Sequence, residues 1–279
     1  MFPPETFLLP MKSPPRSWNE LHIRAKLRLL RMHYESGVGH IGGNLSCLDL
    51  LLILHHRVLL PADQFVLSKG HSAGAYYVTL WTLGKLTEQD LSMFHKDGTR
   101  LSGHPPTSGI EEILFATGSL GHGFSLAAGL ALAKRLKGEP GRVFCLTSDG
   151  ERNEGSCWEA LIFAKHHGLK NLTLLVDLNG LQGFGSTREV ADLEPLAGKF
   201  RSFGLPTLEV DGHDPGELER ALKSHDDGLQ VVVARTRKGC GASFMEDRME
   251  WHYLPMTEAN YRQAVQEIEE ACATLSARH

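Results

Sequence analysis

The stretches VFCLTSDG at residues 143–150 and LTLLVDLNG at residues 172–180 predict the fold of this chain. Each begins as a short apolar run without strict alternation, which is typical of a strand covered on both faces of a sheet. Each run ends in a polar turn, at Asp149-Gly150 and at Asn179-Gly180. A helical pattern at residues 158–167 lies between them, so we expect two parallel strands joined by a crossover helix.

Similar runs extend this pattern along the chain. We expect further strands at residues 65–68, 207–210 and 229–234, and helices at residues 17–36, 46–54, 193–203, 217–224 and 258–275. Ser17 and Glu20 form an S-x-x-E pattern in which each side chain satisfies a free N–H at a helix start, and Ser46 is expected to cap the second helix. Alternating strands and helices predict an α/β fold, a doubly wound, mostly parallel sheet with helices on both faces. Residues 17–279 contain no repeat, linker or composition break, so we expect one domain.

The composition is that of an ordinary globular protein, with 279 residues, 42% of them hydrophobic, and a formal net charge of -4. No basic run and no apolar run of membrane-spanning length occurs, so a small-molecule partner is expected rather than nucleic acid or a membrane. The five cysteines include no C-x-x-C pair, which argues against a disulfide framework or a zinc site. The proline-rich residues 1–16 lack the pattern of a secretory signal, and we interpret them as a mobile tail of a cytoplasmic protein.

The two polar turns also predict a binding site, because ligands bind beyond the carboxyl ends of the strands in such sheets. Asp149 and Asn179 are 30 positions apart and would emerge side by side from adjacent strands. A carboxylate, an amide oxygen and the backbone carbonyl of Leu181 are oxygen ligands that suit Mg²⁺, with diphosphate oxygens and a water completing the shell. Gly150 would let backbone N–H groups approach that phosphate. Taken singly, however, D-G and N-G turns are ordinary loop chemistry.

This pairing resembles the thiamine-diphosphate signature, in which G-D-G is followed at a similar spacing by N. Further segments resemble transketolases specifically: SGVGHIGG at 36–43, LSKGH at 67–71, SGHP at 102–105, ATGSLGHG at 116–123, and SFMED at 243–247 with WH at 251–252. Their order and spacing agree over nearly all of residues 17–279. The chain is therefore identified as similar to the N-terminal, diphosphate-binding subunit of a split transketolase.

The resemblance implies thiamine-diphosphate- and Mg²⁺-dependent transfer of a two-carbon ketol unit from a ketose to an aldose. Each step moves a proton on or off a hydroxyl, which histidine does well near neutral pH. The implied catalytic residues are His40, His71, His104, His252 and Glu154. The implied cofactor-binding residues are His71, Gly118, Ser119, Leu120, Asp149, Gly150, Glu151, Asn179 and His252. Residues His122, His166, His167, His213 and His225 have no such counterpart and are interpreted as structural.

The resemblance also implies features beyond the active-site residues. Glu154 would lie at a subunit interface and join two active sites, although a carboxylate there also stabilises a helix N-terminus. Ser148 replaces the family's first glycine, and Tyr253 replaces the glycine that follows the late histidine and could narrow the substrate channel. The glutamate that activates the cofactor ring belongs to a second domain in this family. We therefore expect a separate partner chain that supplies the pyrimidine-binding domain, in an α2β2 heterotetramer.

Three other interpretations stay open from the sequence. Another thiamine-dependent lyase, or the α subunit of a 2-oxo acid dehydrogenase, would share the metal motif without the G-H segments. A non-catalytic, cofactor-binding regulatory subunit would not be expected to keep the whole set of site residues. A nicotinamide-binding domain would need G-x-G-x-x-G after a strand, of which residues 118–123 are a poor version. The donor and acceptor sugars, whether phosphorylated, sulfonated or neither, are not identified by the sequence.

Overall fold

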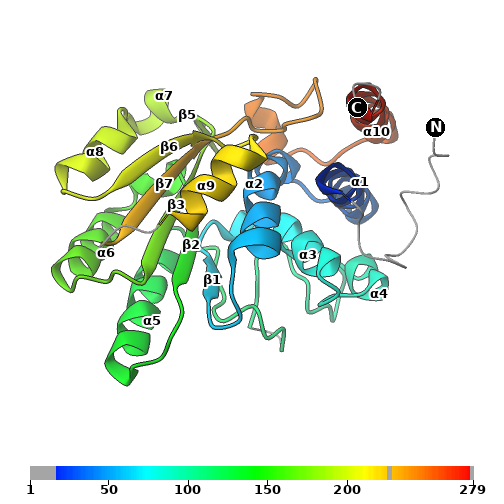
Figure 1. Cartoon of the computed structure of the whole chain (residues 1–279). Helices are drawn as coiled ribbons and strands as arrows, with labels where there is room; N and C mark the ends of the chain where they lie inside the picture. Colours follow the sequence, from blue (N-terminus) through cyan, green and yellow to red (C-terminus); the bar gives the residue numbers. More distant parts are fainter. Residues whose placement is uncertain (1–16, 108, 225–227, 277–279) are drawn as a thin grey trace.

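A single parallel sheet organises the molecule. The structure is a computed structural model that describes residues 17–107, 109–224 and 228–276. Its five-stranded sheet has the order β1-β2-β3-β7-β6, and every pair is parallel (Figure 1). The strands are β1 (Gln64–Leu67), β2 (Val143–Ser148), β3 (Leu172–Leu178), β6 (Thr207–Asp211) and β7 (Gln230–Arg235), with a separate antiparallel pair, β4 (Leu181–Gln182) and β5 (Gly185–Ser186). The predicted α/β fold with a mostly parallel sheet is confirmed.

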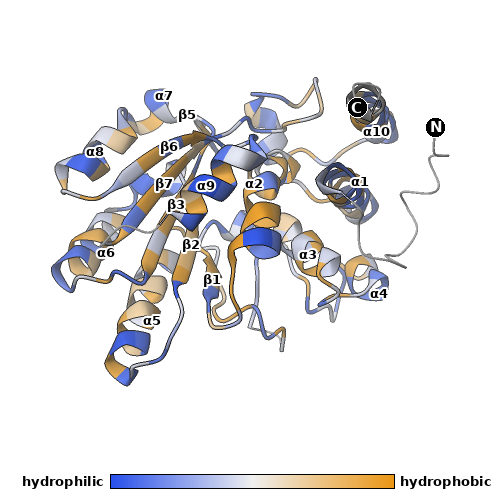
Figure 2. Cartoon of the chain, in the orientation of Figure 1, coloured by the Kyte–Doolittle hydropathy of each residue, from blue (hydrophilic) through white to orange (hydrophobic). Residues whose placement is uncertain are grey.

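Helices cover both faces of this sheet. They are α1 (Trp18–Ser36), α2 (Ile41–Ile53), α3 (Ala73–Thr82), α4 (Glu88–Ser92), α5 (Gly123–Lys137), α6 (Gly155–His166), α7 (Thr187–Ala191), α8 (Leu196–Ser202), α9 (Pro215–Lys223) and α10 (Glu258–Ser276). One apolar core contains Phe144 and Leu146 of β2 and is covered by α1, α2, α3, α9 and α10 (Figures 1 and 2). The other core contains Val143 and Cys145 of β2 and is covered by α5, α6 and α8. Because successive side chains point to opposite faces, a strand buried on both faces is apolar throughout.

Most predicted elements are present, but two helix starts were wrong. Helix α1 begins after Ser17, whose Oγ accepts the Glu20 N–H at 3.2 Å, as predicted. Helix α2 begins at Ile41 and not after Ser46, which lies buried inside the helix. The Ser46 hydroxyl donates to the carboxylate of Asp177 at 2.6 Å, so a tertiary contact and not a helix cap explains this serine. Similarly, α8 begins at Leu196, later than the predicted residue 193.

Other sequence expectations concern the thiols, the tail and the membrane. The cysteines at 47, 145, 157, 240 and 272 are free thiols. Over the described ranges, no helix is long and apolar enough to cross a membrane. The predicted tail at residues 1–16 and His225 lie outside the described residues.

Candidate active site

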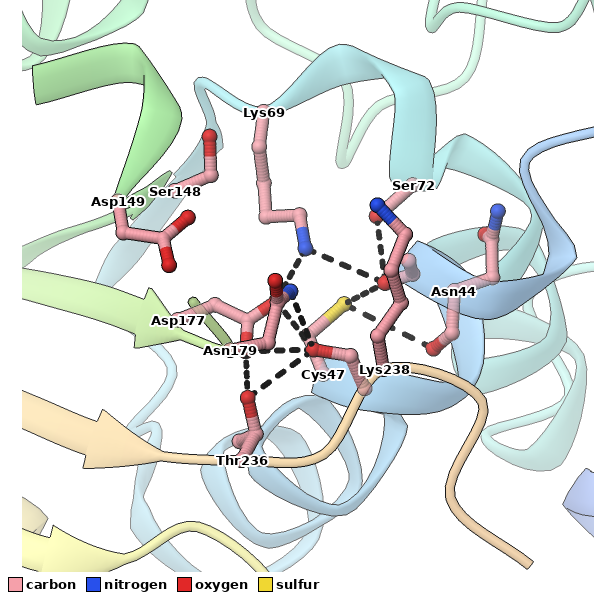
Figure 3. A network of polar contacts seen from close by, with 12 residues as sticks. Asn44, Cys47, Lys69, Ser72, Ser148, Asp149, Asp177, Asn179, Thr236 and Lys238 are labelled. Atoms are coloured by element: carbon pink, nitrogen blue, oxygen red, sulfur yellow. Dashed lines mark hydrogen bonds and ion pairs between the residues drawn. The ribbon is translucent and has the colours of Figure 1, made fainter. Parts of the chain in front are cut away.

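Polar residues that follow four neighbouring strands converge at one edge of the sheet (Figure 3). They are Ser68 and Lys69 after β1, Ser148 and Asp149 at the end of β2, Asp177 and Asn179 at the end of β3, and Thr236 and Lys238 after β7. Helix α2 adds Asn44 and Ser46 at the same edge. Segments far apart in the sequence therefore build one site at the carboxyl ends of the strands, where parallel sheets bind their ligands.

Asp149 joins the two predicted loops. Its Oδ1 accepts the Gly150 N–H at 2.7 Å, and its Oδ2 accepts the Gly180 N–H at 2.6 Å in the loop after β3. Burial and the nearby negative charge of Asp177 together raise the pKa of Asp149 to about 6. A buried carboxylate that is destabilised by a second carboxylate gains from a bound cation. The electrostatics of the loop therefore favour a positive ion beside Asp149.

Asn179 is held by both ends of its side-chain amide. Its Oδ1 accepts the Leu181 N–H at 3.0 Å, and its Nδ2 donates to Ser46 Oγ at 3.1 Å. Gly180 between them has a φ of +75°, in the left-handed region that glycine adopts without strain. The turn thus places the residue after Asn179 in contact with the Asp149 carboxylate. Carboxylate and amide oxygens are donors that Mg²⁺ prefers, so the residues present fit the predicted ion.

A magnesium site here would depend on more than carboxylates. Within the described part of the chain, no group of three or more His, Cys, Asp or Glu residues is arranged to hold a metal ion. Asp149 would therefore need the Asn179 amide, the Leu181 carbonyl and ligand oxygens to complete the shell. Such partial protein coordination is usual for Mg²⁺, which commonly binds phosphates through one or two protein carboxylates.

An ion pair at the centre of the site was not predicted from the sequence. Lys69 Nζ contacts the Asp177 carboxylate, and neither side chain has any solvent exposure. Ser46 and Thr236 also donate hydroxyl hydrogen bonds to Asp177 (Figure 3). Although burial alone would raise the pKa of Asp177, the Lys69 charge and these hydrogen bonds lower it. Lys69 stands inside the quoted LSKGH segment, but the sequence did not show that it pairs with a residue 108 positions away.

Glu151 anchors the loop that follows residue 116. Its buried carboxylate accepts the Gly121 N–H at 2.9 Å and the Ser148 N–H at 3.3 Å, together with the Ser68 hydroxyl. Ser148 Oγ in turn accepts the Glu151 N–H at 3.2 Å. Serine in place of the family's glycine therefore stabilises the turn after β2. Direct contact of Glu151 with a cofactor stays a prediction.

The predicted cofactor loop 118–120 is tightly packed against two histidine segments. Gly118 has a φ of +140°, and a Cβ there would lie 2.7 Å from His104 Cδ2. A Cβ on Gly70 would lie 2.8 Å from Gly118 N. The three glycine-flanked segments at 67–71, 102–105 and 116–123 are therefore in direct contact. Close approach and backbone angle both require glycine at Gly118, whereas at Gly70 close approach alone requires it.

The four histidines predicted to be catalytic form one cluster. The ring centroid of His40 lies 5.9 Å from that of His71, 5.8 Å from His104 and 5.1 Å from His252. The His71 and His252 rings are 5.5 Å apart. Each ring comes from a different segment, and His40 occupies the residue before α2 with a φ of +66°. The structure thus brings together histidines from four separate segments of the chain.

The environment keeps these imidazoles neutral. Burial, followed by the proximity of His104, lowers the pKa of His40 to about 4. Burial is also the main cause that lowers the pKa of His104 and, more strongly, that of His71. A neutral imidazole donates from one nitrogen and accepts at the other. Such groups can exchange protons with sugar hydroxyls and carbonyls at neutral pH.

A small cavity of about 70 Å³ lies beside this cluster. Its lining includes His33, His40, Asn44, His71, His95 and His104. Among these, the sequence indicated no role for His33, Asn44 or His95. Asn44 Nδ2 donates to the His71 carbonyl at 3.1 Å, and its Oδ1 accepts the Ala75 N–H at 2.7 Å, so it holds the His71 segment against α2. Lys238 was not predicted either; its Nζ lies 3.0 Å from His252 Nδ1.

Glu154 and Tyr253 lie at the margins of the site. Glu154 is exposed at the start of α6, where it lies against Gly121. Tyr253 is 54% exposed, and its hydroxyl donates to the Gly183 carbonyl at 2.8 Å. The tyrosine therefore connects the late loop to the loop after Asn179. Of the histidines interpreted as structural, His213 Nδ1 bonds to Asp49 at 2.8 Å and His122 bonds to the Ser119 carbonyl at 3.1 Å.

Comparisons with known proteins show the family of the chain. Residues 26–270 match the family described as transketolase, thiamine diphosphate binding domain. The chain is 35% identical to an apulose-4-phosphate transketolase subunit of Phocaeicola vulgatus, over 87% of this chain and 90% of that protein. It is 36% identical to the 6-deoxy-6-sulfo-D-fructose transketolase subunit SqwG of a Clostridium species, over 84% of this chain and 89% of that protein.

Solved transketolase structures are also similar to this chain. The transketolase of Campylobacter jejuni superposes with a TM-score of 0.82 and 27% identity, over 89% of this chain and 42% of that one. This chain thus spans less than half the length of the solved transketolase. The family match and these relatives show a thiamine-diphosphate-binding enzyme subunit of the transferase class. The chain belongs to the transketolase family, as its thiamine-diphosphate-binding domain, and the family predicted from the sequence is confirmed.

Proposed function

We propose that this chain is the diphosphate-binding subunit of a two-chain transketolase, with residues 17–279 acting as one domain. The observation that carries the proposal is the juxtaposition of two features at one sheet edge. One is the pair of loops in which Asp149 receives the Gly180 N–H. The other is the cluster of neutral histidines around His40. A cofactor site and a proton-transfer site would thereby lie side by side.

The proposed reaction transfers a two-carbon ketol unit from a ketose to an aldose. Thiamine diphosphate, when bound, supplies the carbon nucleophile that carries this unit between the two sugars. His40 and His104 are proposed to bind the sugar's oxygens and to move protons between them. His71 is proposed to lie next to the cofactor, and the loop 118–120 to contact it through the backbone. Neutral rings suit these tasks because each presents both a donor and an acceptor.

Asp149, Asn179 and the carbonyl of Leu181 are proposed to hold Mg²⁺, which would bind the diphosphate. Gly150 begins a 3-10 turn, and its lack of a side chain would let a phosphate approach the backbone there, where its N–H now donates to Asp149. Glu151 positions this turn through its contacts with Ser148. Together these residues would supply the charge and the donors that a diphosphate needs.

A partner chain is proposed from the names and lengths of the relatives. The apulose-4-phosphate and 6-deoxy-6-sulfo-D-fructose transketolase relatives are of similar length and are described as subunits, whereas this chain spans 41% of human transketolase. We propose that two copies of this chain assemble with two copies of a partner that supplies the pyrimidine-binding domain. Glu154, exposed next to Gly121, is proposed to lie in the interface. The relatives act on apulose phosphate or a sulfonated fructose by name, and for this chain we propose a ketose donor bearing an anionic group.

The test is to purify the chain alone and with the partner chain, and to measure molecular mass and ketol transfer to an aldose. We expect transfer only from the complex in the presence of thiamine diphosphate and Mg²⁺. Full transfer by the lone chain would contradict the split-enzyme proposal. A complex that binds thiamine diphosphate yet transfers no two-carbon unit from phosphorylated or sulfonated ketoses would favour the non-catalytic alternative.

The cytoplasmic location stays a prediction from composition.

A further inference from the structure

Cys240 lies among charged side chains that the proposed mechanism does not use. It stands in the turn that follows β7, and it is only 6% exposed. Arg237 Nη2 donates to its Sγ at 3.9 Å, and the Cys240 N–H donates to the Arg237 carbonyl at 3.2 Å, which closes the turn. The guanidinium also pairs with Glu246 through its other terminal nitrogen. The sulfur therefore has a cation against it.

A second cation approaches the same turn from α1. Lys26 is 6% exposed, and a Cβ on Gly241 would lie 3.2 Å from its Nζ. Among the described residues, its ammonium group has no hydrogen-bond or ion-pair partner. A buried cation without an anion is destabilising. An anion at the neighbouring Cys240 would therefore relieve an unpaired buried charge.

The carboxylate of Asp49 does not supply that anion. Its Oδ2 lies 2.8 Å from His213 Nδ1, and its Oδ1 contacts His22 Nε2, so two imidazoles occupy it. Although burial alone would raise the pKa of Cys240, contact with His213 and the charge of Lys26 lower it. The charge of Asp49 opposes this shift less strongly than those two neighbours promote it. The cluster as a whole therefore favours the thiolate.

The other buried thiols are in the opposite situation. Burial raises the pKa of Cys47 and of Cys157 to about 11, and that of Cys145 well above its usual value. The Cys47 thiol donates to the Gly43 carbonyl at 3.4 Å, and the Cys157 thiol donates to the Glu151 carbonyl at 3.3 Å. Buried, protonated thiols are unreactive, so these three serve as references within the same chain.

We propose that Cys240 is a modification site at which hydrogen peroxide oxidises the thiolate to a sulfenate, with Lys26 and Arg237 stabilising both anions. His213 and Arg237 line a surface groove of about 590 Å³, which brings a small solute close to the turn. The sulfur attacks one peroxide oxygen, the O–O bond breaks, and hydroxide leaves. Sulfur loses two electrons to the peroxide, and the hydroxide takes the proton of the sulfenic acid to form water. The inference rests on this cluster and not on the proposed function.

The pH dependence of alkylation tests the thiolate in the natural, full-length chain. Iodoacetamide is applied between pH 5 and pH 10, and peptide mass spectrometry gives the rate at each cysteine. Because restricted access slows the reaction at every pH, the midpoint of the profile reports the thiolate fraction. We expect the midpoint for Cys240 to lie below that of N-acetylcysteine, and the three reference thiols to stay unmodified. A midpoint at or above that of N-acetylcysteine, or a Cys240 that reacts only in urea, would overturn the proposal.

Substitution of the two cations tests the cause. Lys26→Met keeps the buried stem and removes an unpaired charge, so it should fold normally by circular dichroism and raise the Cys240 midpoint by about one pH unit or more. Arg237→Gln, at an exposed side chain, should raise it less. Lys85→Met, which removes an exposed partner of Glu112, is the matched control and should leave the midpoint unchanged. A midpoint that moves no further in Lys26→Met than in this control would contradict the proposal.

Peroxide treatment tests the product. A cyclic 1,3-dione that reacts with sulfenic acids is added with hydrogen peroxide at pH 7, and the labelled peptides are identified. We expect label at Cys240, labelling about threefold or more slower in Lys26→Met because less thiolate is present, and none at this position in Cys240→Ser. Absence of label at Cys240 under conditions that oxidise N-acetylcysteine would show that the site does not react with peroxide, and would overturn the proposal.

Discussion

Lys69 and Asp177 form an ion pair with no solvent exposure on either side chain, and they lie at the ends of two strands that are separated by β2. Burial alone would lower the pKa of Lys69, but the Asp177 charge raises it. Lys69 also donates to the Gly43 carbonyl at 3.2 Å, in α2. The pair therefore ties β1, β3 and α2 together next to the loop that carries Asp149.

Lys69→Met should destabilise the chain by about 3–5 kcal/mol, because it leaves the Asp177 carboxylate buried without its cation. The double variant Lys69→Met/Asp177→Asn should recover part of this loss, since a neutral amide can still accept the Ser46 and Thr236 hydroxyls. Urea unfolding of the three chains measures the difference. A double variant that is less stable than Lys69→Met would show that the cost does not arise from an unpaired charge.

Much of the fold could be predicted because its signals are local. Strands β1, β2, β3 and β7 of the main sheet are largely apolar runs, and burial on both faces makes every residue of β2 apolar or small. Helix α5 was missed because it carries no side-chain cap at its start and contains Gly129. Ser46 was misread as a cap because a serine before an apolar run has the same appearance whether its hydroxyl bonds to the backbone or to a distant carboxylate.

The grouping of the candidate site residues was predictable where they stand in recognisable turns. The G-H segments and the two loops after β2 and β3 identified the residues that the structure brings together. The residues that hold them, such as Lys238 and Asn44, were not identified, because their partners are fixed only by tertiary packing. Asp177 lies within an apolar strand, and a single sequence gives no sign that a buried lysine neutralises it.

Asp149→Ala should weaken Mg²⁺-dependent binding of thiamine diphosphate by about 10–100-fold or more, because it removes the anionic ligand of the proposed ion. It should also free the Gly150 and Gly180 N–H groups, which now donate to Asp149. Calorimetry with the partner present measures the affinity. Asp97→Ala, at an exposed aspartate, is the control and should bind the cofactor normally. Unchanged affinity in Asp149→Ala would rule out the metal assignment.

Substitution of His40 and His104 should separate catalysis from cofactor binding. His40 has a φ of +66°, where asparagine is tolerated better than alanine, so His40→Asn and His104→Ala are the suitable variants. We expect both to bind thiamine diphosphate nearly normally, yet to lose about 10²-fold or more in kcat/KM for the donor ketose. His166→Ala changes an exposed histidine outside the cluster and should retain activity. A parallel loss of cofactor affinity in both variants would instead indicate a structural role.

His33 should make the stability of the chain fall as the pH is lowered. Its ring is buried against Phe94, and its Nδ1 donates to the Leu29 carbonyl at 3.1 Å. Burial lowers the pKa of His33 from 6.5 to about 4. The unfolded chain therefore binds a proton below pH 6.5 that the folded chain does not bind, and stability present above pH 6.5 is lost as the pH falls toward 4.

His33→Asn tests this linkage, because an amide can keep the hydrogen bond to Leu29 but does not titrate. At pH 7.5 the variant should be less stable than the natural chain by about 1–2 kcal/mol, since the smaller side chain loses contact with Phe94. The lowered pKa of His33 alone predicts that the free energy of unfolding of the natural chain falls by about 2 kcal/mol between pH 7.5 and pH 5. The variant should lack that part of the loss, so the two stabilities converge at acid pH. Urea unfolding at pH 7.5, 6 and 5 measures the free energy of unfolding of the natural chain and of His33→Asn. Parallel pH profiles for the two chains would show that His33 is protonated equally in the folded and unfolded states, and the assignment of the pH dependence to this residue would be wrong.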